Sequence, residues 1–119
     1  MENEIVRTSQ IRIDVHLDQD KMPSRIQWEA DDSDAEGKHE SKSVMLAFWD
    51  GLVQNAMRID LWTKDMTISE MNLFMYQTLV TFADTFENAT DNKEVAAEMR
   101  DFAHQIGHKL EVFGTDHHH

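Results

Sequence analysis

The sequence has no cysteine among its 119 residues, and only one proline and four glycines. Without cysteine the chain forms no disulfide and carries out no thiol catalysis, and we expect no lipid anchor on an N-terminal cysteine. The scarcity of proline and glycine leaves no segment with the composition of a flexible linker. Together with a hydrophobic content of 40%, the length of the chain predicts one folded domain over residues 1–113.

Basic residues are also scarce, with 11 lysines and arginines against 23 aspartates and glutamates and a formal net charge of −12. Nucleic acids are bound largely through basic side chains that neutralise phosphates, so we expect no binding to nucleic acid. Attraction to an anionic membrane surface is disfavoured for the same reason. Solubility accounts for the acidity, and the functional alternative is a basic surface on a protein partner.

Long hydrophobic runs are missing as well, and no stretch approaches the length of a membrane-spanning helix. The chain opens with Met1-Glu2-Asn3-Glu4, which lacks the apolar core of a secretory signal. We therefore expect a cytoplasmic protein that does not insert into membranes. The chain ends in Asp116-His117-His118-His119, which we interpret as the remnant of a purification tag, so residues 114–119 are treated as a tail.

Four segments have the pattern of β-strands. Residues 11–17 and 26–30 alternate between apolar and polar side chains, as half-buried strands do. Residues 44–49 form a short apolar run that fits either a strand or part of a helix. The turn signal Asp50-Gly51 favours a hairpin with a strand at residues 57–62. In that hairpin one face carries Met45, Trp49 and Trp62, and the other carries Val44, Leu46, Phe48, Met57, Ile59 and Leu61.

Helical spacing begins after Thr67, which forms a capping box with Glu70 three residues later. The first helix has a broad apolar stripe and, nearly opposite, a narrower stripe of Leu73, Tyr76 and Val80. Asp91 and Glu94 fit the cap of a second helix, which we expect to cover the narrow stripe, a second copy of the chain being the alternative cover. The second helix has a single apolar stripe of Val95, Met99, Phe102, Ala103, Ile106 and Leu110.

These elements predict an α+β fold. A four-stranded, mostly antiparallel sheet is followed by two C-terminal helices packed on one face of it. Residues 31–40 are polar and are expected to be a loop, made acidic by Asp31, Asp32, Asp34 and Glu36. Asp32-x-Asp34-x-Glu36-Gly37 resembles the start of a calcium-binding loop, but the twelfth position is Ser43 where a bidentate glutamate is needed. A solvated acidic loop is the better interpretation.

Two further sets of side chains have types that carry chemistry. His104 and His108 are four residues apart on the second helix, a spacing that can present two imidazoles to one metal ion. They lie opposite the apolar stripe without an H-E-x-x-H motif, so we expect no metal site or cofactor beyond weak nickel or zinc binding. The carboxylates of Asp60, Asp65, Glu70 and Asp84 suit acid–base work, but nothing in the sequence brings them together, and no catalytic residue is predicted.

The predicted interaction surface combines Met45, Trp49 and Trp62 with the acidic loop, because aromatic residues and methionine are enriched in interface cores. The alternative is that the N-terminal segment or a loop covers these three side chains. The alternative function is a small-molecule or metal-binding module with a pocket between sheet and helices, for which the eight methionines are adaptable lining residues. A hydrolytic enzyme has no motif in its favour.

A run of residues through the centre of the chain resembles the gliding motility protein GldC family of gliding bacteria. The similar positions are residues 59–66, Glu70-Met71, Phe74, residues 77–79, 83–85 and 89–90, with Leu17-Asp18, Pro23, Ile26, Trp28 and Trp49-Asp50 upstream. The similarity spans residues 4–106, and none of these positions forms a catalytic motif. The resemblance implies an accessory role in gliding motility, which we expect to be non-catalytic and to act through a protein partner of the gliding or secretion machinery.

Overall fold

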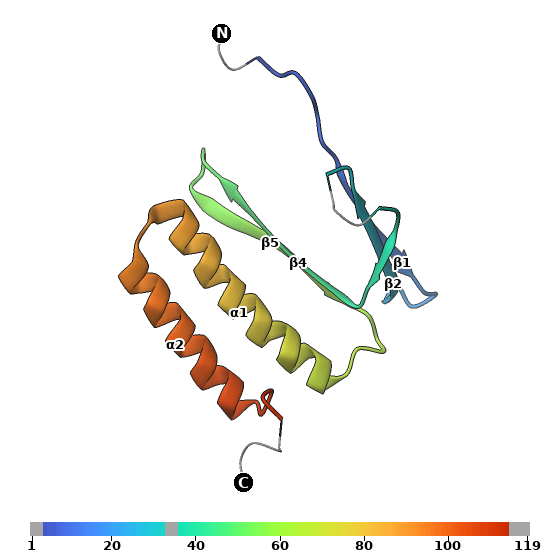
Figure 1. The fold of residues 1–119 in the computed structure, drawn as a ribbon. Helices are drawn as coiled ribbons and strands as arrows, with labels where there is room; N and C mark the ends of the chain where they lie inside the picture. Colours follow the sequence, from blue (N-terminus) through green and yellow to red (C-terminus); the bar gives the residue numbers. More distant parts are fainter. Residues whose placement is uncertain (1–3, 33–35, 115–119) are drawn as a thin grey trace. The chain divides into compact units, whose positions relative to one another are not determined.

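A computed structural model describes residues 4–32 and 36–114 (Figure 1). The chain divides into two compact units, Met1–Met66 and Thr67–His119. The described strands lie in the first unit and the two helices in the second. The predicted α+β class is therefore confirmed, whereas one domain over residues 1–113 and packing of the helices on a sheet face stay predictions.

A three-stranded antiparallel sheet opens the first unit. It has the order β1 (Ile11–Leu17), β2 (Pro23–Ala30) and β3 (His39–Ser41). Ile13 lies opposite Trp28 and Val15 opposite Ile26, so the predicted alternation places these apolar side chains on one face. Ile26 is completely buried there. The expectation of a loop up to residue 40 is wrong at its end, where β3 begins at His39. The strand was missed because its polar sequence His-Glu-Ser has no alternation of apolar and polar residues.

The second sheet is an antiparallel ribbon of two strands, β4 (Ser43–Asp50) and β5 (Asn55–Trp62). This confirms the predicted hairpin and shows that residues 44–49 are a strand. The register pairs Val44 with Leu61, Leu46 with Ile59 and Phe48 with Met57, so the predicted division into two faces is also confirmed.

The prediction of one four-stranded sheet is wrong, because the segment from β3 to β4 changes partner at Lys42. β3 pairs with β2 and β4 pairs with β5. Beyond the last β2–β3 pair, the residues that follow β5 form hydrogen bonds with the backbone carbonyl groups of Lys42 and Pro23. Thr63 N donates to Lys42 O at 2.8 Å, and Lys64 N donates to Pro23 O at 3.3 Å. This insertion separates the start of β2 from β4 and leaves two sheets.

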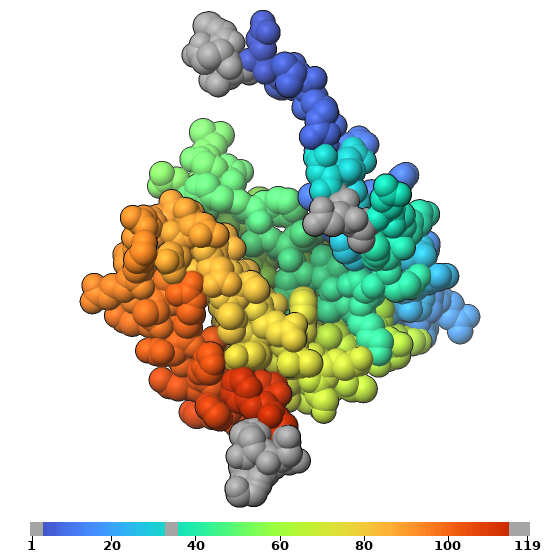
Figure 2. Space-filling view, viewed as in Figure 1, coloured from blue at the N-terminus to red at the C-terminus, as the bar shows by residue number. Residues whose placement is uncertain are grey.

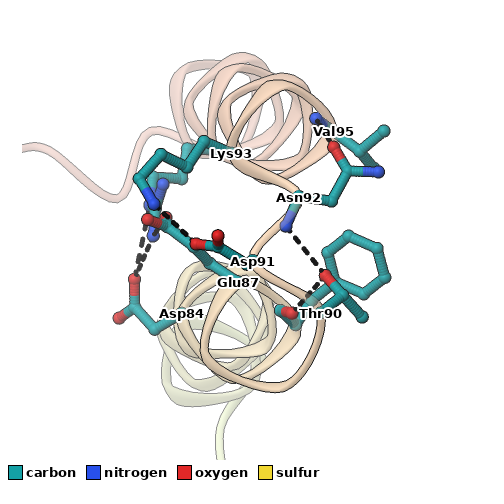
Figure 3. A network of polar contacts seen from close by, with 9 residues as sticks. Asp84, Glu87, Thr90, Asp91, Asn92, Lys93 and Val95 are labelled. Atoms are coloured by element: carbon teal, nitrogen blue, oxygen red, sulfur yellow. Dashed lines mark hydrogen bonds and ion pairs between the residues drawn. The ribbon is translucent and has the colours of Figure 1, made fainter.

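In the second unit, α1 (Ile68–Thr90) begins with the predicted capping box. Glu70 N donates to Thr67 Oγ1 at 3.1 Å, and Thr67 N donates to Glu70 Oε1 at 2.9 Å. The cap predicted for α2 (Lys93–Lys109) is displaced by one residue, because Asp91 ends α1 with a φ of 59°. Asn92 is the true N-cap and accepts from Val95 N at 3.1 Å (Figure 3).

α1 and α2 pack against each other through small residues. Ala96, Ala103 and Gly107 of α2 and Ala83 of α1 are buried. Tyr76 belongs to this contact, as predicted. However, Val95 and Phe102 of the predicted stripe are 39% and 54% exposed, so the stripe does not form the contact as a whole. Ala103 belongs to the stripe, whereas Ala96 and Gly107 lie further round α2, and together these small residues allow the helices to approach closely.

Candidate interaction surface

One face of the β4–β5 ribbon, called the Trp face here, consists of Ser43, Met45, Ala47, Trp49, Ala56, Arg58, Asp60 and Trp62. Trp49 is 68% exposed and Trp62 is 55% exposed, while Met45 is half-buried. Trp49 pairs with Ala56 and Trp62 with Ser43, at opposite ends of the ribbon. Six residues of β-strand separate the two positions by roughly 20 Å. The tryptophans therefore share a face, as predicted, but form two separate apolar points.

An ion pair occupies the centre of the Trp face. Arg58 Nη2 lies 2.7 Å from Asp60 Oδ1, and Arg58 Nε donates to Asp60 Oδ2 at 3.1 Å. These hydrogen bonds hold the pKa of Asp60 below its ordinary value. The Trp face consequently presents apolar, charged and apolar regions in succession along the ribbon.

A hollow of about 170 Å³ lies beside Trp62 and is lined by Met22, Pro23, Asp60, Leu61 and Trp62. It forms where the β1–β2 turn is tied to the end of β5. Lys64 Nζ lies 2.6 Å from Asp18 Oδ2, and Asp18 Oδ1 also accepts from Met22 N at 3.0 Å. The hydrogen bond from Lys64, followed by that from Met22, lowers the pKa of Asp18. The turn that carries Met22 is thereby fixed next to Trp62.

The N-terminal segment does not cover the Trp face within the described residues. Residues 4–10 run away from the strands of the first unit as an extended arm (Figure 2, blue). Arg7 forms two hydrogen bonds of 3.2 Å with the Asp32 carboxylate, and Gln10 N donates to Asp31 Oδ2 at 3.0 Å. The arm is thus anchored at the acidic loop.

The acidic loop is less available than its sequence indicates. Asp31 and Asp32 hold the N-terminal arm, and hydrogen bonds from Ser9 and Arg7 lower the pKa of Asp32. Glu36 is exposed, and Asp34 lies outside the described residues, as do residues 115–119 of the tail. Among the described residues of this loop, no side chain belongs to a group of three that could hold a metal ion. Its role as an interaction surface stays a prediction.

His104 and His108 belong to an aromatic cluster rather than to a solvated face alone. The Phe113 ring lies 5.7 Å from His104 and 4.7 Å from His108, and Tyr76 meets Phe113 edge-on at 5.0 Å. Across the described ranges, neither histidine joins two further metal-binding side chains. The sequence signal for this cluster was Phe113, which continues the second helix's apolar pattern beyond the helix end.

The four carboxylates considered for acid–base work each have a separate structural partner. Asp60 pairs with Arg58, Asp65 accepts from Thr63, Glu70 caps α1, and Asp84 pairs with Arg100 at 2.8 Å. Glu70 and Asp84 stabilise the helical unit, Glu70 at the start of α1 and Asp84 across the helix pair. These contacts account for all four residues without a shared reaction site.

An apolar groove between α1 and α2 was missed by sequence reasoning. It measures about 300 Å³ and is lined by Leu79, Phe82, Val95, Glu98, Met99 and Phe102. The signal was present, since the broad stripe of α1 and the stripe of α2 supply its apolar residues.

No described helix is both long and apolar enough to cross a membrane.

The model of a family described as "Gliding motility-associated protein GldC-like" matches residues 23–112, which is most of the chain. No curated protein and no solved structure matches the chain significantly. The matched region includes β2 to α2, and with them every residue of the Trp face.

Proposed function

The chain belongs to the GldC-like family of gliding motility-associated proteins, and we propose that it is a non-catalytic accessory protein that works by binding another protein. The observation that carries this proposal is the exposure of Trp49 and Trp62 on one face of a regular ribbon. Tryptophan is enriched among the residues that dominate binding energy at protein interfaces. A free surface that keeps two of them exposed is suited to a partner.

The geometry of the Trp face indicates what a partner needs. The partner carries two apolar side chains roughly 20 Å apart, which contact the two tryptophans. Between them it carries polar groups that contact the Arg58–Asp60 pair. One of its apolar side chains enters the hollow between Met22 and Trp62. A helix of about 13 residues spans this distance, and so does an extended strand of about six residues.

The test is affinity capture from a lysate of a gliding bacterium, followed by mass spectrometry. Three forms of the full chain are compared: the wild type, the double variant Trp49→Ala/Trp62→Ala, and the control Phe48→Ala/Met57→Ala. The control removes two similarly exposed side chains from the opposite face of the same two strands. We expect a component of the motility machinery to be recovered with the wild type and the control, and lost with the tryptophan variant.

Undiminished recovery with a folded Trp49→Ala/Trp62→Ala variant would remove the Trp face from the proposal. A third variant, Glu36→Lys, tests the acidic loop without breaking the contacts of Asp31 and Asp32 with the N-terminal arm. Loss of the partner with this variant alone would move the binding surface to the loop.

A further inference from the structure

The free edge of β4 is unusual for an exposed strand. Among the described strands β4 has a neighbour on one side only, β5, over its whole length from Ser43 to Asp50. Natural edge strands are protected by lysine, proline or a bulge. Between Ser43 and Trp49 the strand has no charged residue, no proline and no glycine. β5, in contrast, carries Arg58 and Asp60 at its centre.

An unprotected edge of this composition pairs readily with another strand. Residues 44–49 are Val-Met-Leu-Ala-Phe-Trp, which combines high β-propensity with zero charge. Phe48 and Trp49, on opposite faces, are both more than half exposed. A ribbon of two strands is itself marginal in water, and further strands or packing against a helix stabilise it. The edge therefore has both the chemistry and the energetic reason to be paired.

We propose that the occupant is a second copy of this chain, with the two β4 strands antiparallel and centred on Ala47. The absence of charge from this edge makes it a place where two copies of the chain can meet. With a net charge of −12, two copies repel each other wherever acidic surfaces meet. Pairing centred on Ala47 brings together only uncharged residues from position 45 to position 49, so no like charges face each other.

Side-chain size fits the same register. Ala47 lies opposite Ala47 of the second copy, Leu46 opposite Phe48, and Met45 opposite Trp49. Each pair joins residues on the same face of the sheet, because their numbers differ by an even number or zero. Methionine sulfur also packs favourably against an indole ring. The result is a four-stranded sheet, in the order β5-β4-β4-β5, on which the Trp faces of both copies form one surface. This inference does not depend on the proposed function.

Sedimentation velocity over a concentration series tests the pairing on the full chain, with Ala47→Lys and the matched control Ala56→Lys. Both alanines are exposed and point to the same face, but Ala56 is on β5. Ala47→Lys sets two lysines opposite each other at the centre of the dimer. We expect it to raise the dimer dissociation constant by at least about tenfold, and Ala56→Lys to change it much less.

A second measurement decides the question if Ala47→Lys fails to fold. Because the chain has no cysteine, Ala47→Cys can form a disulfide only between copies. In the proposed register the two introduced thiols belong to directly opposed residues, whose Cα atoms lie within disulfide range. We expect rapid dimer cross-linking of Ala47→Cys and slow cross-linking of Ala56→Cys. A wild type that stays monomeric at every concentration, equal weakening by both lysine variants, or faster cross-linking of Ala56→Cys would each overturn the proposal.

Discussion

Gly107→Ala is the most informative single substitution for the helical unit, because two physical effects of opposite sign meet at this position. In the interior of a helix, alanine is favoured over glycine by about 0.5–1 kcal/mol. A Cβ atom at Gly107, however, would lie 2.8 Å from Cε2 and Cζ of Phe113 and 2.9 Å from Cδ1 of Tyr76. Three such contacts require both rings to move.

The size of the two effects predicts the sign. Inserting a methyl group into a well-packed contact costs about 1–3 kcal/mol, which exceeds the gain in helix propensity. We therefore expect Gly107→Ala to lower the free energy of unfolding by about 1–2 kcal/mol. Urea unfolding followed by far-UV circular dichroism measures it. The control is Ala97→Gly at an exposed position of the same helix, which should cost about 1 kcal/mol through propensity alone.

A thermodynamic cycle with Phe113→Leu identifies the cause. If the Phe113 ring is the obstacle, Gly107→Ala costs less in the Phe113→Leu background, with a coupling of at least about 0.5 kcal/mol. A Gly107→Ala variant more stable than the wild type would refute the reasoning, because it would mean that helix propensity decides the outcome and that α1 and α2 do not approach closely at this residue.

Three further predictions concern the other contacts. Asn92→Ala should lower the free energy of unfolding by about 1 kcal/mol in urea, because it removes the N-cap of α2, whereas Asp91→Ala should leave that cap intact. Asp18→Asn should lower the melting temperature at neutral pH. The pKa of Asp18 in the folded state is depressed, so the stability that its carboxylate contributes is present above the ordinary pKa and is lost as the pH falls through the folded value. The difference in melting temperature between Asp18→Asn and the wild type should therefore shrink in acid. A difference that stays constant with pH would contradict the Lys64 contact. The three tryptophans lie in the first unit and the helices in the second, so coincident urea transitions by fluorescence and circular dichroism are expected if residues 1–113 are one cooperative domain, and separate transitions would divide it.

The sequence was sufficient for features that depend on neighbouring residues. Alternation predicted β1, β2 and the faces of the β4–β5 ribbon, because each strand's side-chain period is set locally and Asp50-Gly51 marks the turn. The capping box at Thr67 was predictable for the same reason, since both of its hydrogen bonds span three residues.

Features that depend on distant backbone groups were not predictable. The division into two sheets follows from the hydrogen bonds of Thr63 with Lys42 and of Lys64 with Pro23, which join segments far apart in the sequence. The α1–α2 contact was assigned to the apolar stripe of α2, which includes Ala103, because hydrophobicity dominates the helical pattern. The structure buries Ala103 together with Ala96 and Gly107, which lay outside that stripe, since small side chains permit the closest approach of two helices.

The distribution of burial explains why both proposals concern the β4–β5 ribbon. In the described part of the chain the fully buried hydrophobic residues are Ile26 and three alanines. Of the seventeen large hydrophobic side chains that are exposed there, seven lie between residues 48 and 62. Burying one such side chain contributes about 1.5–3 kcal/mol, so a partner that covers the ribbon would gain more hydrophobic free energy there than elsewhere on the first unit. The acidic loop offers a partner less, because Asp31 and Asp32 already form hydrogen bonds within the chain.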